Sequence, residues 1–77
     1  MLIQVLGPGC KKCTQLKENA EEAVAKAGVD ATVEKVDDIV KITSFGVMMT
    51  PAIAIDGEVK VVGKVSTVDE IVAMITQ

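Results

Sequence analysis

The sequence predicts a single α/β domain over residues 1–77, in which a mixed four-stranded sheet carries helices on both faces. Three observations lead to this class: an apolar, strand-like run opens the chain, amphipathic helical stretches separate the next strands, and an Asp-Gly turn joins the last two strands. A helix between two strands makes them parallel, whereas a two-residue turn makes the strands that it joins antiparallel. The expected element order is βαβαββα.

The first half of the chain reads as a buried strand, a long helix and a second strand. Residues 1–6 are almost entirely apolar, which is typical of a buried strand, and Gly7-Pro8-Gly9 ends it. Apolar residues then recur every three or four positions from Cys10 to Ala27, which predicts a helix with one apolar stripe. Gly28 suits the end of that helix, and residues 31–36 suit a strand.

The second half of the chain contains the clearest local signals. Asp56-Gly57 favours a hairpin turn, and Thr67 followed by Glu70 forms a capping box that begins a helix. The segments predicted here are a helix at 39–45 capped by Asp37-Asp38 and ended by Gly46, strands at 52–55 and 59–62, and a helix at 68–76.

Composition and charge exclude several classes of partner. The chain has eight lysines against eleven acidic residues, a net charge of −3, and one aromatic residue. This is the opposite of the basic, aromatic surfaces that bind nucleic acid, so we expect no nucleic-acid partner. No apolar run reaches the ~18 residues of a membrane span, so we expect no membrane partner either. Because the strand pattern starts at Met1, we expect no targeting segment and a cytoplasmic location. We also expect a monomer.

Cys10 and Cys13 are the two cysteines of the chain, which has no histidine. A disulfide between them would close too short a loop to hold distant segments together, so the spacing indicates redox or metal chemistry. At the start of a helix, the helix dipole and the charges of Lys11 and Lys12 favour the thiolate of Cys10 and lower its pKa. Cys10 is therefore the candidate nucleophile, and Cys13, one turn deeper on the apolar stripe, the candidate resolving thiol. The two lysines are equally well explained as solvated surface charges.

Thr50-Pro51 directly precedes the third predicted strand. A proline that cannot donate a hydrogen bond suits the first position of a strand. The local sequence alone favours a trans bond, because only about 5–6% of X–Pro bonds in folded proteins are cis. We expect Met48 and Met49, just before this pair, to divide between the core and its rim.

Together these motifs resemble the thioredoxin fold. The matching residues are Gly-x-Gly-Cys-x-x-Cys after the first strand, then Phe45-Gly46-Val47-Met48-Met49-Thr50-Pro51-Ala52-Ile53, Asp56-Gly57 and Gly63. The chain is most similar to the small thioredoxin-like and glutaredoxin-like proteins of archaea and bacteria, called redox-active disulfide proteins. The resemblance implies a redox-active Cys10–Cys13 disulfide, and a cis Thr50-Pro51 that packs against it and positions the substrate. It implies no cofactor, protein disulfides as substrates, and a reductase or low-molecular-weight thiol as electron donor.

Departures from the family pattern leave the electron donor open. Thioredoxins usually carry Trp before the first cysteine, Gly-Pro between the two, and a buried Asp six residues before the first. Here Gly9, Lys11-Lys12 and Gln4 occupy these positions. Val62-Gly63-Lys64 replaces the glutathione-binding segment of glutaredoxins. The resemblance therefore implies neither coupling to thioredoxin reductase nor glutathione binding.

Two other functions fit the same cysteine pair. A heavy-metal-associated domain also places Cys-x-x-Cys after its first strand, where two thiolates hold Cu(I) or help to hold Zn²⁺. Those domains have the order βαββαβ and usually Met two residues before the first cysteine, where this chain has Pro8. The other alternative is a redox-regulatory or iron–sulfur thioredoxin-fold protein without turnover. With no histidine, we expect no structural metal.

Overall fold

The computed structural model describes residues 1–7 and 11–76, and the element order across them is βαβαββα, as the sequence predicts. The strands are β1 (Leu2–Leu6), β2 (Thr32–Val36), β3 (Ala52–Ile55) and β4 (Glu58–Val62), and the helices are α1 (Lys11–Ala27), α2 (Ile39–Ser44) and α3 (Val68–Ile75). The predicted α/β class is confirmed. Because the last element is a helix, the βαββαβ order of the metal-binding alternative is excluded.

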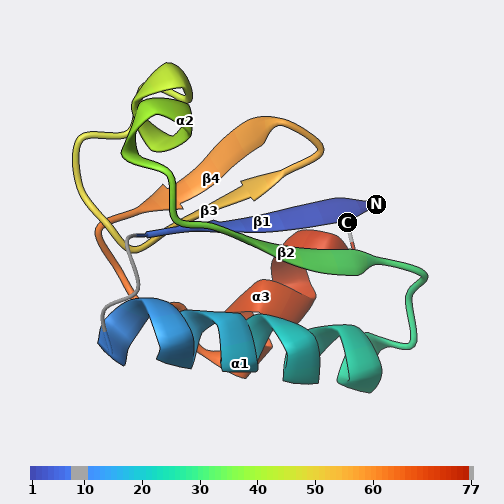
Figure 1. The fold of residues 1–77 in the computed structure, drawn as a ribbon. Coiled ribbons are helices and arrows are strands. Elements are labelled where there is room, and N and C mark those ends of the chain that lie inside the picture. Colours follow the sequence, from blue (N-terminus) through green and yellow to red (C-terminus); the bar gives the residue numbers. More distant parts are fainter. Residues whose placement is uncertain (8–10, 77) are drawn as a thin grey trace.

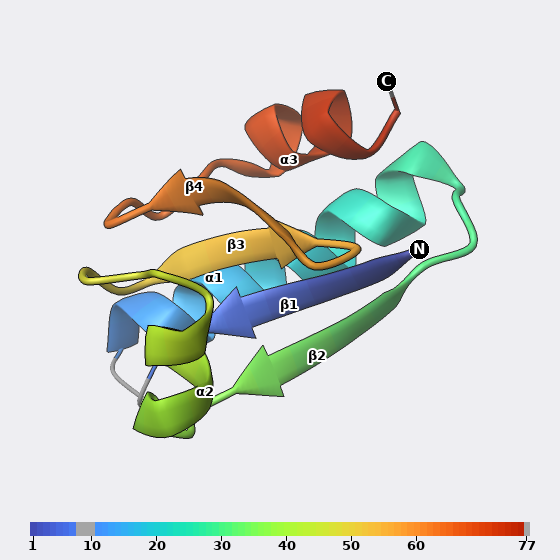
Figure 2. The ribbon, with the colours of Figure 1, turned by 90° about the horizontal axis from the view of Figure 1, so that it is seen from above.

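The four strands of the described chain form one mixed sheet in the order β2-β1-β3-β4 (Figures 1 and 2). Strand β1 pairs in parallel with β2, with Leu2 opposite Thr32, and antiparallel with β3, with Ile3 opposite Ile55. Strand β4 completes the sheet antiparallel to β3. The first strand of the chain is therefore central and has a neighbour on each side.

Helices cover the two faces of the sheet unequally. Figure 1 shows α1 and α3 side by side beneath the sheet, while the short α2 lies above it. Because successive strand residues point to opposite faces, Ile3 and Val5 face α1 and α3, whereas Leu6 faces α2. The core beneath the sheet consists of Ile3, Val5, Leu16, Ala20, Ala23, Ile53, Ile55, Ile71 and Ile75. A smaller core under α2 consists of Leu6, Val36, Ile42, Val47, Ala52 and Ala54.

The hairpin between β3 and β4 also ties its turn to β1. Asp56 and Gly57 have φ angles of 51° and 85°, the left-handed values of the tight turns that Asp-Gly favours. The Asp56 carboxylate accepts a hydrogen bond from the Leu2 N–H at 2.8 Å, and the Asp56 N–H donates to the Leu2 carbonyl at 2.8 Å. The register of β3 against β1 is thus held at this end of the sheet by the turn itself.

Within residues 1–7 and 11–76, no helix is long and apolar enough to cross a bilayer.

Candidate functional site

The end of β1 and the beginning of β3 lie side by side and bring three segments together. Leu6 pairs with Ala52, so Gly7, just after β1, and Pro51, just before β3, flank the same end of the sheet. Helix α1 begins nearby at Lys11, and Cys13 lies in its first turn. The predicted nucleophile Cys10 lies outside the described residues.

Gly7 is the point at which these segments meet most closely. A Cβ atom added to Gly7 would collide with the Cys13 Sγ, lie 2.9 Å from the Cys13 Cβ and 3.9 Å from the Thr50 Cβ. Cys13 and Thr50 therefore both border this one position. The Gly7 N–H donates to the Val36 carbonyl at 2.9 Å, which fixes the Gly7 backbone to the end of β2. The sequence had suggested only that Gly7 ends a strand.

Cys13 is fully buried, on the same helix face as Leu16 and Ala20. This matches the apolar stripe predicted for the helix. By contrast, Lys11 and Lys12 are exposed at the start of α1, and the first turn of that helix contains no acidic residue. The helix therefore begins with a buried sulfur on one side and positive charge on the other.

The residues that follow β4 hold the segment before β3 in place through hydrogen bonds. The Thr50–Pro51 peptide bond is cis, with Pro51 buried and Thr50 exposed. The Pro51 carbonyl accepts hydrogen bonds from the Gly63 N–H at 2.8 Å and the Lys64 N–H at 3.3 Å. Thus Gly63 and Lys64, which are far from Pro51 in the sequence, help to fix its position at the start of β3.

Both Met48 and Met49 lie at the surface, so the expectation that one of them enters the core is wrong. Their exposed fractions are 88% and 64%. The adjacent Val47 is buried in the core under α2, whereas both methionine side chains remain outside it. Met49 packs instead on Gly63, with its Cε 3.3 Å from the place where a Gly63 Cβ would lie. The two methionines provide an apolar surface directly before Thr50.

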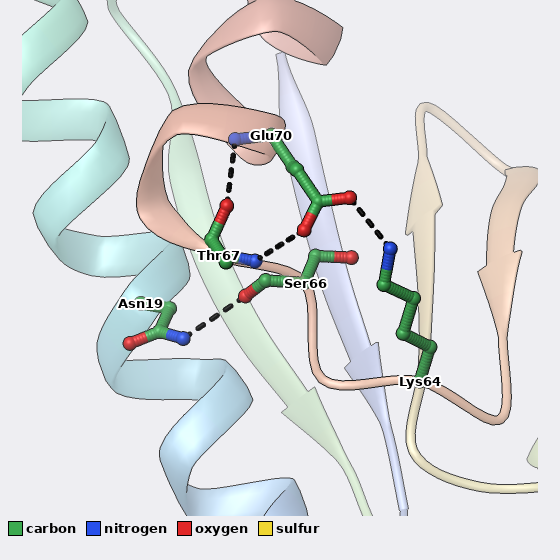
Figure 3. A network of polar contacts seen from close by, with 5 residues as sticks. All are labelled: Asn19, Lys64, Ser66, Thr67 and Glu70. Atoms are coloured by element: carbon green, nitrogen blue, oxygen red, sulfur yellow. Dashed lines mark hydrogen bonds and ion pairs between the residues drawn. The ribbon is translucent and has the colours of Figure 1, made fainter.

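A polar network connects the loop after β4 to two helices (Figure 3). The two oxygens of Glu70 accept from the Thr67 N–H at 3.0 Å and from the Lys64 Nζ at 2.6 Å, and the Glu70 N–H donates to the Thr67 Oγ1 at 3.2 Å. The predicted capping box is therefore present. The hydrogen bond from Lys64, together with that from the Thr67 backbone, lowers the pKa of Glu70 to about 2. From α1, the Asn19 Nδ2 donates to the Ser66 carbonyl at 2.9 Å.

The low pKa of Glu70 gives folding stability a specific pH dependence. The carboxyl group has a pKa of about 2 in the fold and an ordinary value of 4.5, so the unfolded chain binds its proton more tightly. The stabilisation is fully present above pH 4.5 and is lost as the pH falls toward 2. Urea unfolding between pH 2 and 6 should show that Glu70→Gln flattens this part of the profile. Glu21→Gln, at an exposed position on α1, should leave the profile unchanged; equal profiles for wild type and Glu70→Gln would contradict the assignment.

Across the described part of the chain, no three acidic or cysteine side chains gather into a group that could hold a metal ion.

Comparison with known proteins agrees with this arrangement. A family model described as a thioredoxin domain matches residues 1–76. The chain is 42% identical over 71 residues to a thioredoxin of Methanothermobacter thermautotrophicus, which covers 92% of each chain. It is 39% identical over 71 residues to a thioredoxin of Methanocaldococcus jannaschii, covering 92% of this chain and 81% of that protein. The chain therefore belongs to the thioredoxin domain family and is, in general terms, a thiol–disulfide oxidoreductase.

Proposed function

We propose that this protein reduces disulfide bonds of other proteins through the dithiol of Cys10 and Cys13. The observation that carries the proposal is the position of Cys13: its buried side chain packs on the Gly7 backbone at a point that Thr50 also borders. A resolving thiol has to be shielded from solvent and still lie next to the segment that receives the substrate. Cys13 meets both requirements.

The reaction consists of two thiol–disulfide exchanges. The Cys10 thiolate attacks one sulfur of the substrate disulfide; a mixed disulfide forms, and the other substrate sulfur leaves as a thiolate that takes up a proton. The Cys13 thiol then loses its proton and attacks the Cys10 sulfur, which releases the second substrate thiolate and forms the Cys10–Cys13 disulfide. Two electrons pass from the dithiol to the substrate. A reductase or a low-molecular-weight thiol returns them.

The charges at the start of α1 support Cys10 as the attacking thiolate. Lysines in the first turn of a helix oppose the helix dipole, at a cost of about 0.3–1 kcal/mol each, and the first turn of α1 has no acidic residue to offset Lys11 and Lys12. An anion at the preceding position would be stabilised by both lysines and by the helix N-terminus. We infer that Lys11 and Lys12 help to hold Cys10 as a thiolate.

Thr50 and Pro51 are the proposed substrate-positioning residues. Thr50 is exposed and borders the same point as Cys13, while Pro51 is buried and held by two backbone hydrogen bonds. An extended substrate segment can pair with the Thr50 backbone, with its apolar side chains against Met48 and Met49. We further propose that the protein works as a single domain and a monomer in the cytoplasm, with no cofactor.

Reduction of insulin disulfides, followed by turbidity, tests the proposal and identifies the donor. Reduced protein should accelerate insulin reduction by dithiothreitol, and the Cys10→Ser variant should not. Parallel assays with NADPH and thioredoxin reductase, and with glutathione and glutathione reductase, show which donor restores the dithiol. No acceleration with any of the three donors would overturn the proposed function.

A further inference from the structure

We propose that Glu70 is a positioning residue for Thr50 and Pro51, which receive the substrate. Through Lys64 it holds the loop after β4, and the position of Pro51 depends on that loop. The inference rests on the proposed function, because it concerns how a protein disulfide is received at Thr50 and Pro51. Glu70 lies on α3 and contacts the Lys64 side chain, whereas Pro51 contacts the Lys64 backbone; Glu70 is not among the neighbours of Gly7. Its effect is therefore transmitted and does not involve the reacting sulfurs.

The first step of the argument is the dependence of Pro51 on the loop. The Pro51 carbonyl accepts from the backbone N–H groups of Gly63 and Lys64, at 2.8 and 3.3 Å. Met49 also packs on Gly63. A shift of Gly63 and Lys64 therefore moves both the start of β3 and the apolar surface beside it.

The second step is the contact that holds Lys64. Its ammonium group lies 2.6 Å from the Glu70 Oε2, while the other carboxylate oxygen caps the first turn of α3 at the Thr67 N–H (Figure 3). Capping requires only one oxygen. The second oxygen is thus available for a contact that the helix itself does not need, and this contact closes the loop of residues 64–70.

The third step is the link from this loop to the helix that carries Cys13. The Asn19 Nδ2 donates to the Ser66 carbonyl at 2.9 Å (Figure 3). The Asn19 Oδ1 accepts from the Gln15 Nε2 at 2.9 Å. Asn19 and Cys13 belong to the same helix, α1. One loop therefore contacts α1 at Ser66 and Pro51 at Lys64, and so it links the helix that carries Cys13 to the start of β3. Glu70 closes that loop.

The structure offers a matched set of variants. Glu70→Gln keeps an oxygen for the cap but loses the charge that attracts Lys64, and Lys64→Met keeps the aliphatic stem without the charge. Lys64→Arg retains a cation and serves as the rescue. Asp69→Asn is the control, because Asp69 precedes Glu70 on α3 and makes a similarly short ion pair, 2.7 Å, with Lys26 on α1 and not with Lys64. Circular dichroism at 25 °C verifies that every variant is folded.

The measurement compares the reduction of a protein disulfide with that of a small disulfide compound, which has no peptide segment to pair with Thr50 and Pro51. Insulin reduction, with dithiothreitol as the reductant, gives KM and kcat; reaction of the reduced protein with 5,5′-dithiobis(2-nitrobenzoate) gives the intrinsic reactivity of the dithiol. We expect Glu70→Gln and Lys64→Met each to raise KM for insulin about threefold, the size expected for an exposed ion pair, without changing kcat or the small-disulfide rate. The double variant should show no further increase, and Lys64→Arg should restore KM.

Other outcomes would overturn the inference. These are an unchanged KM in Glu70→Gln or Lys64→Met, an equal rise in Asp69→Asn, multiplication of the two effects in the double variant, or a parallel loss of reaction with the small disulfide. If the wild-type protein does not accelerate the reduction of insulin, the proposed function itself fails. That result is distinct, because it appears before any variant is made.

Discussion

Replacing Cys13 by Ser is expected to abolish turnover and to trap substrate proteins on Cys10. The first exchange needs only the Cys10 thiolate, so the mixed disulfide still forms, whereas release of the second substrate thiol needs the sulfur at position 13. Insulin reduction should fall to the rate of the reductant alone. When the pre-reduced variant is mixed with insulin without dithiothreitol, non-reducing electrophoresis followed by peptide mass mapping should find the insulin chains bound to Cys10.

The Cys10→Ser variant is the matched control for this experiment. Cys13 is fully buried, so without Cys10 no thiol is expected to be accessible to a protein disulfide, and nothing should be trapped. Limited alkylation of the reduced wild-type protein should likewise modify Cys10 first. Trapping by Cys10→Ser but not by Cys13→Ser, or first modification at Cys13, would reverse the assigned roles.

Gly7→Ala is expected to destabilise the fold and to disturb the site together. The added methyl group would collide with the Cys13 Sγ and lie 2.9 Å from its Cβ, closer than carbon atoms approach without moving. Overpacking of this kind lowers the free energy of unfolding by about 1–3 kcal/mol. Urea unfolding measures this loss. The rate of insulin reduction, measured at a temperature where the variant is folded, should also fall, because Cys13 is displaced relative to Thr50.

Repeating the Gly7→Ala substitution in a Cys13→Ala variant separates the collision with the sulfur from other effects of removing a glycine. In Cys13→Ala the sulfur is absent, so the cost of Gly7→Ala should shrink. Gly28→Ala is the comparison: Gly28 has a φ of +66° and no neighbour within 4 Å of an added Cβ, so it loses stability only through backbone strain, equally in both backgrounds. An equal cost of Gly7→Ala with and without the Cys13 sulfur would show that the contact does not matter.

The sequence predicts most of the fold because its signals are local. Asp56-Gly57 contains the turn, and Thr67 with Glu70 contains the cap, so each pattern specifies its own geometry and both are present in the structure. The apolar stripe of α1 likewise predicts the burial of Cys13, because the helical period decides which face meets the sheet.

The features that could not be predicted depend on segments distant in sequence. Nothing near Gly7 shows that Cys13 will pack on it, and nothing near Lys64 shows that its amide will bind Pro51 and its ammonium Glu70. The expectation for Met48 and Met49 was wrong for a related reason. The apolar side chains of Met48 and Met49 favour burial, but in the structure the adjacent Val47 enters the core under α2 and the two methionines do not.

The central position of β1 has a consequence for synthesis on the ribosome. Strand β1 emerges before β3, and its antiparallel edge has no partner until residues 52–55 have been released. During that interval, β1, α1 and β2 can assemble, but Ile3 and Val5 lie on a strand whose open edge can pair with another chain. A nascent chain that stalls before Ala52 therefore has an unpaired edge on β1 that can bind another chain. The β3–β4 hairpin covers this edge when it emerges.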